Sequence, residues 1–116
     1  TDNASILVKM ENGSSGVVNY FANGAKSYSK ERLEVFSQEK VLIMDNFIKT
    51  SGYGIKGFSK LKTKLDKGHK AQFGQIVEKI KQGSVQLIPY DELINVTKAS
   101  LAAIESLKKG AWIKVD

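Results

Sequence analysis

The stretch RLEVFSQEKVLIMD, residues 32–45, decides the fold of this chain. Its two ends, residues 32–36 and 41–45, are rich in the β-branched, aromatic and aliphatic residues that suit strands. The polar residues 37–40 separate them and form a connection short enough for a tight turn. The stretch therefore predicts two antiparallel strands joined as a hairpin.

A second hairpin is predicted upstream of this one. Apolar residues alternate in SILVKM, residues 5–10, and GVVNYF, residues 16–21, follows after Asn12-Gly13. Asn-Gly accepts the positive φ angles of a two-residue hairpin turn. A polar connection at residues 23–30 leads to the next strand pair, so the first half of the chain reads as an antiparallel meander.

The hydrophobic period changes in the second half of the chain. Apolar residues recur there at the spacing of one helix face, at Phe73, Ile76, Val77 and Ile80. Gly83 ends this pattern. A second apolar stripe follows Pro89, and residues 108–110, Lys-Lys-Gly, supply the cations and the glycine that commonly end a helix. We expect helices at about residues 68–82 and 91–109, and a last short strand at residues 112–115.

Strands followed by helices predict an α+β fold, with one open, mainly antiparallel sheet of five or six strands and two helices packed on one face. A chain of 116 residues, 41% of them hydrophobic, suits a single domain over residues 1–116. No apolar run approaches the ~20 residues that span a bilayer, and no signal-like region begins the sequence. We expect a cytoplasmic protein without a membrane partner.

Three glycines match the spacing of a dinucleotide-binding turn, G-x-G-x-x-G, at Gly52, Gly54 and Gly57. That turn joins a strand to a helix amino terminus, whose free N–H groups hold the pyrophosphate. Residues 60–64 instead alternate lysines with other residues, which predicts a strand. We therefore interpret the glycines as a loop between strands and assign no cofactor-binding residue.

Most of the basic character lies in one segment. The formal net charge is +6, and residues 54–70 contain six lysines and one aspartate. Lysines at alternate positions of a strand are typical of a solvated face or a protected edge. Single-strand binding usually adds interleaved aromatic residues, and only Tyr53 and Phe58 are available here. A stand-alone basic module that binds polyanions such as nucleic acid is the alternative interpretation.

No constellation of catalytic or metal-binding residues stands out. The chain has no cysteine, which excludes disulfides, thiolate metal ligands and a cysteine nucleophile. His69, the single histidine, follows a glycine at an expected helix start, where capping or surface exposure is common. We expect Asp66 to cap that helix and Trp112 to pack beneath the last strand. No catalytic residue and no metal ligand are assigned.

Three segments, in this order, resemble one enzyme family. They are GVVNYFANGAKSYSKERLEVFSQEKVLIMDNF at residues 16–47, LDKGHKAQFGQIVEKIKQG at residues 65–83 and IPYDELINVTKASLAAIESLKKGAWIKV at residues 88–115. They are similar to the carboxy-terminal domain of the glucose-fructose oxidoreductase / inositol dehydrogenase family, also called Gfo/Idh/MocA, and most similar to its bacterial sugar-modifying dehydrogenases. The last segment is the most specific of the three.

The resemblance implies an NAD(P)-dependent oxidoreductase that acts on a sugar, a polyol or a nucleotide sugar. Its Rossmann domain would bind NAD or NADP, and the domain represented here would shape the substrate pocket and form homo-oligomers through its open sheet. This sequence contains no Rossmann unit, no lysine of the family's Glu-Lys-Pro motif and no Asp…His segment before the first strand. We therefore expect the isolated chain to be inactive and to bind no cofactor.

The substrate-binding residues are predicted from chemistry, since polyhydroxylated or anionic substrates need hydrogen-bond donors. We expect Lys30, Arg32 and His69 to contact the substrate. We also expect self-association through the sheet. A sheet with one solvated face should alternate apolar and polar residues along each strand, but here apolar residues occupy both odd and even positions, so both faces need cover. These residues are Val17, Tyr20, Phe21, Leu33, Val35, Phe36, Leu42, Ile43 and Met44.

Overall fold

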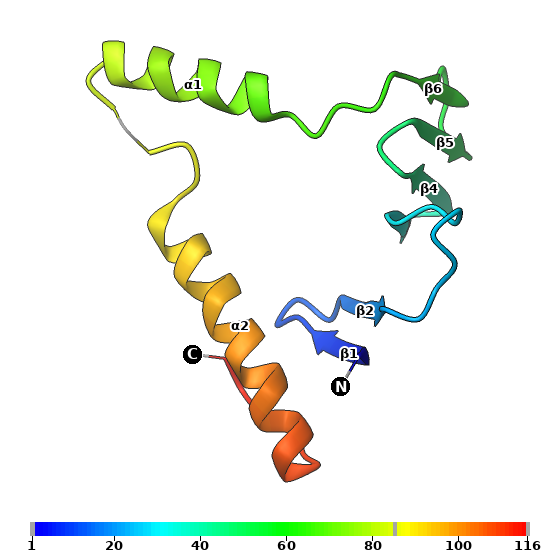
Figure 1. Cartoon of the computed structure of the whole chain (residues 1–116), viewed down its shortest axis with the longest axis vertical. Coiled ribbons are helices and arrows are strands. Elements are labelled where there is room, and N and C mark those ends of the chain that lie inside the picture. Colours follow the sequence, from blue (N-terminus) through cyan, green and yellow to red (C-terminus); the bar gives the residue numbers. More distant parts are fainter. Residues whose placement is uncertain (1, 85, 116) are drawn as a thin grey trace. The chain divides into compact units, whose positions relative to one another are not determined.

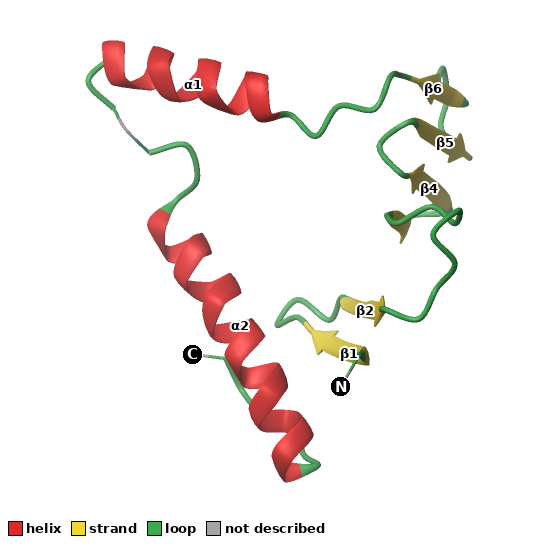
Figure 2. Cartoon of the chain, viewed as in Figure 1, coloured by secondary structure: helices red, strands yellow, loops and turns green. Residues whose placement is uncertain are grey.

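The computed structural model describes residues 2–84 and 86–115. Strands come first and helices second along the chain, as Figures 1 and 2 show. The elements are β1 (Asn3–Lys9), β2 (Ser15–Phe21), β3 (Arg32–Ser37), β4 (Lys40–Asp45), β5 (Lys49–Tyr53), β6 (Lys60–Lys62), α1 (His69–Lys81) and α2 (Tyr90–Lys109). The α+β class with antiparallel strands is confirmed.

The strands form two sheets rather than one. One sheet consists of β1 and β2, and the other has four strands in the order β3-β4-β5-β6. Each sheet is built from neighbours in sequence, joined by short turns that fix their register. The connection at residues 22–31 is longer and polar, so it does not align β2 with β3 as a tight turn would. This is consistent with the two strands belonging to different sheets.

The chain divides into two compact units. One contains the β1–β2 hairpin and the two helices, and the other contains the four-stranded sheet. Packing of the helices on one face of the sheet therefore stays a prediction.

In the first unit, the turn and helix-end predictions are confirmed. Gly13 takes a φ of 86° between β1 and β2, and its N–H donates to the Met10 carbonyl at 3.0 Å. Gly110 ends α2 in the left-handed conformation, with its N–H donating to the Ser106 carbonyl at 2.8 Å. Gly83 follows the end of α1 with a φ of 74°.

The predicted strand at residues 112–115 is wrong. These residues have no regular structure, and Trp112 is 61% exposed rather than packed beneath a strand. The chain turns back at the end of α2, where the Ser106 hydroxyl donates to the Ala111 carbonyl at 2.6 Å. The Lys9 ammonium instead lies over the Trp112 ring, 5.4 Å from the ring centre, in a cation–π contact. The strand-favouring residues of this short segment were therefore not sufficient to predict a strand.

The four-stranded sheet has two different faces, because directly paired residues point to the same side. Leu33 pairs with Met44, and Val35 pairs with Leu42. Thr50 joins the first row and pairs with Leu61. We call this side the apolar face; its apolar strand residues are Leu33, Val35, Leu42, Met44 and Leu61.

The opposite side, which we call the charged face, carries Arg32, Glu34, Asp45, Lys49, Lys60 and Lys62. Charges occupy one end of it. At the other end Phe36 pairs with Val41, and Val41 pairs with Tyr53. Apolar residues therefore occur on both faces: one face is mainly apolar and ends in the Ser37–Lys40 pair, and the other is apolar at one end.

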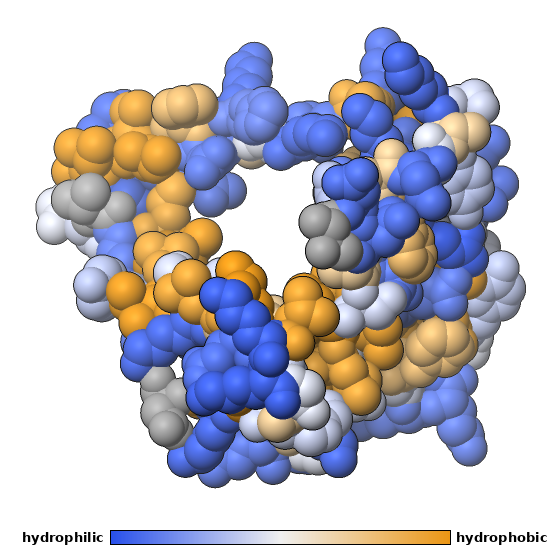
Figure 3. Space-filling view, turned by 60° about the horizontal axis from the view of Figure 1, so that its bottom comes forward, coloured by the Kyte–Doolittle hydropathy of each residue, from blue (hydrophilic) through white to orange (hydrophobic). Residues whose placement is uncertain are grey.

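Apolar side chains of both units remain open to solvent. None of the residues that the structure describes is classed as buried, and Phe36 and Phe73 are 70% and 67% exposed. The space-filling view shows hydrophobic surface beside hydrophilic surface (Figure 3). A surface of this kind needs cover, because contiguous apolar patches are rare on free monomers.

Candidate functional site

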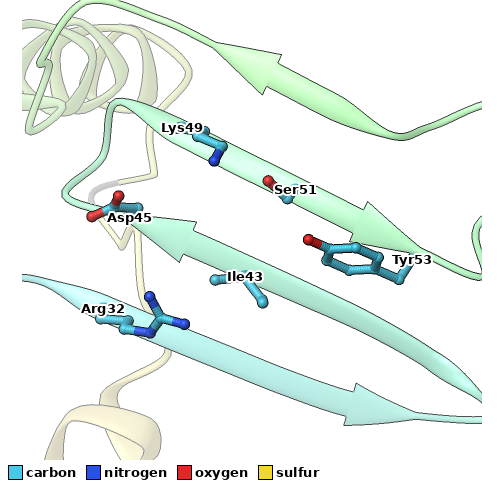
Figure 4. Close-up of a pocket in the computed structure, with 6 residues that line it drawn as sticks. All are labelled: Arg32, Ile43, Asp45, Lys49, Ser51 and Tyr53. Carbon is cyan, nitrogen blue, oxygen red and sulfur yellow. The ribbon is translucent and has the colours of Figure 1, made fainter.

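The charged face of the four-stranded sheet contains a shallow hollow of about 160 Å³. Side chains from three neighbouring strands line it (Figure 4). They are Arg32 from β3, Ile43 and Asp45 from β4, and Lys49, Ser51 and Tyr53 from β5. We call these six residues the sheet hollow.

Strand pairing brings the lining residues together. Arg32 pairs with Asp45, and Asp45 pairs with Lys49, so these three form one row across the sheet. Ile43 pairs with Ser51 in the next row. The period of two along β5 then adds Tyr53, whose hydroxyl points towards the middle of the group in Figure 4.

An ion pair fixes the Arg32 guanidinium. Its Nε and Nη2 donate to one oxygen of the Glu34 carboxylate at 2.8 and 2.5 Å. The hydrogen bond and the charge of Glu34 raise the pKa of Arg32 above its ordinary value. The two side chains stand two residues apart on β3 and therefore share the charged face.

The sheet hollow suits a ligand with several hydroxyl groups. Arg32 and Lys49 donate hydrogen bonds, Asp45 accepts them, and the hydroxyls of Ser51 and Tyr53 do both. The Ile43 side chain and the Tyr53 ring offer apolar surface for the carbon skeleton of such a ligand. Binding sites typically combine a few placed polar groups with apolar walls in this way.

Of the three predicted substrate-binding residues, Arg32 lines the hollow and the other two do not. Lys30 lies in the connection before β3, and His69 is the first residue of α1; both are exposed. Asp66 was predicted to cap this helix, and it forms a hydrogen bond just before the helix begins. Its carboxylate accepts a hydrogen bond from the Gly68 N–H at 2.8 Å, directly before α1 begins.

The G-x-G-x-x-G match has a structural explanation within the sheet. Gly52 belongs to β5, and a Cβ there would lie 2.5 Å from Cδ1 of Phe58. Gly54 has a φ of 68°, and its Cβ would lie 2.6 Å from the Glu39 carbonyl oxygen. Gly57 turns the chain with a φ of 78° towards β6. Gly54 and Gly57 lie in the connection between β5 and β6, as interpreted, whereas Gly52 lies within β5; the element that follows is the strand β6 and not a helix.

The other five lining residues were missed as site residues: Ile43, Asp45, Lys49, Ser51 and Tyr53. They could have been found from the alternation of side chains along residues 49–53, combined with the pairing register of β4 and β5. The segment KTSGY has few strand-favouring residues, so no strand was predicted at residues 49–53 and their alignment with Arg32 could not be foreseen.

Comparison of the chain with protein-family models, with curated proteins and with solved structures finds no match in any of the three. Neither helix in the described part of the chain has the length and apolarity needed to cross a bilayer. Within residues 2–84 and 86–115, no three His, Asp or Glu side chains gather as a metal site would require.

Proposed function

We propose that this chain is the substrate-side domain of an NAD(P)-dependent oxidoreductase of the Gfo/Idh/MocA type. The substrate is a sugar, a polyol or a nucleotide sugar, and the enzyme works in the cytoplasm. Support comes from the three segments that resemble the family, and from the confirmed α+β class that the resemblance implies. The observation that carries the substrate class is the mixture of donors and acceptors around the sheet hollow.

In this proposal Arg32 positions the substrate. Glu34 holds its guanidinium through Nε and Nη2 at 2.8 and 2.5 Å, which limits its movement. Asp45 and Tyr53 complete a wall that can accept and donate hydrogen bonds to neighbouring hydroxyls. The chain's own glycines do not fit a dinucleotide, so a separate Rossmann domain binds NAD or NADP and supplies the hydride chemistry.

The proposal also gives the domain a role in assembly. The apolar face of the sheet and the exposed apolar side chains of both helices need partners. Homo-oligomers through an open sheet meet this need, and the Rossmann domain covers further surface.

Substrate kinetics of the full-length protein test the proposal. Arg32→Ala should raise KM for the sugar substrate about tenfold, the loss expected for one charge-assisted hydrogen bond, and leave KM for the cofactor unchanged. Lys56→Ala, in the loop between β5 and β6, is the matched control. An unchanged substrate KM in Arg32→Ala would remove the sheet hollow from the substrate site.

Calorimetry on the 116-residue chain gives an independent check. Titration with NAD(H) or NADP(H) should release no heat of saturable binding at micromolar concentration. Tight binding by the chain alone would contradict both the loop interpretation of its glycines and the proposed division of labour.

A further inference from the structure

A second hollow, of about 300 Å³, adjoins the sheet hollow at the edge of the same sheet. It shares Asp45 and Lys49 with the sheet hollow. Its other polar lining residues come from three segments: Ser29, Asn46, and the adjacent Lys62 and Thr63. Apart from Asp45, every polar residue here can donate a hydrogen bond.

Backbone pairing places two like charges directly opposite each other in this hollow. Lys49 on β5 pairs with Lys62 on β6. Thr63 fixes this arrangement, because its N–H donates to the Ile48 carbonyl at 2.8 Å and its hydroxyl donates to the Phe47 carbonyl at 3.1 Å. Like charges directly opposite on neighbouring strands destabilise a sheet, so the pair requires a compensating role.

Lys60 adds a third ammonium group on the same face, two residues from Lys62. Among the described residues, none of these three lysines forms an ion pair with a carboxylate. Ion pairs form elsewhere, for example Arg32–Glu34, Lys67–Glu31, Lys81–Glu78 and Lys109–Glu105. We call Lys49, Lys60 and Lys62 the lysine cluster.

From this juxtaposition we infer that the lysine cluster, together with Ser29 and Asn46, binds the phosphate or diphosphate group of a small molecule. Three ammonium groups supply charge, and the serine hydroxyl and asparagine amide supply oriented donors for phosphate oxygens. Asp45 and the Arg32–Glu34 pair bound the positive area on one side. A compact anion fits such an area better than a polymer backbone that needs an extended track.

The electrostatics of Lys60 agree with this inference. The positive charge of Lys62 lowers the pKa of Lys60, and partial desolvation and the charge of Lys49 act in the same direction. A bound anion would reverse the effect of the two neighbouring cations. The inference does not depend on the proposed oxidoreductase role, because any phosphorylated small molecule presents the same chemistry.

The experiment is a titration of the isotope-labelled 116-residue chain with inorganic pyrophosphate, followed by NMR of backbone amides and lysine Cε signals. Signals of residues 46–49 and 60–63 should shift together and saturate. Lys62→Gln should weaken binding about tenfold, and Lys62→Arg should restore most of the affinity. Lys56→Gln, which changes the net charge equally, should weaken it less than about twofold.

Three results would overturn the inference: no saturable shift, equal weakening by Lys56→Gln and Lys62→Gln, or tighter and steeply salt-dependent binding of a ten-nucleotide oligothymidylate. The last would assign the lysines to nucleic acid. Circular dichroism of each variant establishes that it remains folded. Failure here leaves the proposed function intact, since that proposal rests on Arg32 and substrate KM.

Discussion

The two faces of the four-stranded sheet are formed by alternating residues of the same strands, β3–β6, yet the two faces need different partners. The apolar face, from Leu33 to Leu61, has no charge at its centre and requires cover by another surface. The charged face satisfies part of its own surface through the Arg32–Glu34 pair and presents hollows to a ligand. One sheet can therefore serve assembly on one side and recognition on the other.

A charge at the centre of the apolar face should cause the largest loss of stability. Leu42 pairs with Val35 on one side and with Gly52 on the other. Leu42→Asp should lower the free energy of unfolding by about 3 kcal/mol, because it removes apolar contacts and places a charge among apolar side chains. Urea unfolding followed by circular dichroism measures the loss.

The matched control is Ser51→Asp on the charged face. It should change the free energy of unfolding by less than about 0.5 kcal/mol, because the half-buried Ser51 pairs with Lys60, whose charge can offset the new carboxylate. Equal losses in the two variants would show that the faces do not differ as described.

Self-association should depend on the apolar face and not on the charged face. Leu61 lies on the edge strand β6, on the apolar face, and is 51% exposed. Leu61→Lys should weaken dimerisation about tenfold in sedimentation velocity over a concentration series, whereas Phe36→Ser on the opposite face should have little effect. The reverse order would assign association to the charged face, and a strictly monomeric parent chain at high concentration would refute it.

A smaller effect is expected from Gly52→Ala. The new methyl group would lie 2.5 Å from the Phe58 ring, which covers the apolar face at this point. Moving the ring should cost about 1 kcal/mol in the free energy of unfolding. Ser51→Ala, the neighbouring residue on the other face, should cost measurably less; a loss as large as that of Gly52→Ala would contradict this packing.

The smallest effect concerns protonation on the charged face. Lys62→Gln removes the largest cause of the lowered pKa of Lys60, so that pKa should rise towards its ordinary value of 10.5. In the parent chain the unfolded state binds the Lys60 proton more tightly, so stability should rise slightly with pH just below 10.5. A Cε NMR titration of Lys60 in both proteins measures the shift, and an unchanged pKa would refute the coupling.

Local sequence was sufficient for much of the fold. The hairpin at residues 32–45 and both helices follow from hydrophobic period and from their terminal residues. The turns do not always carry ideal residues: Gln38 and Glu39 have φ angles of 48° and 60°, values for which Asn-Gly would be favoured. The pairing of β3 with β4 evidently outweighs this preference.

Features that depend on distant partners were not predicted. β5 is a strand because β4 and β6 pair with it, although its residues Lys-Thr-Ser-Gly-Tyr favour strands weakly. Residues 112–115 are rich in strand-favouring side chains, yet they adopt no regular structure. The sheet hollow also depends on distant residues. Its hydrogen-bond donors allowed Arg32 to be predicted, whereas the other lining residues can be identified only when the pairing register of β3, β4 and β5 is known.

The glycines of β5 and the following loop also bear on how such sequences are compared. Gly52 lies under an aromatic ring and Gly54 lies against a backbone carbonyl, so both are constrained by packing. Mutations there would be removed by selection in any descendant that keeps this sheet, whatever the protein binds. Persistence of the G-x-G-x-x-G spacing through evolution would then record the geometry of a sheet and not the inheritance of a nucleotide site.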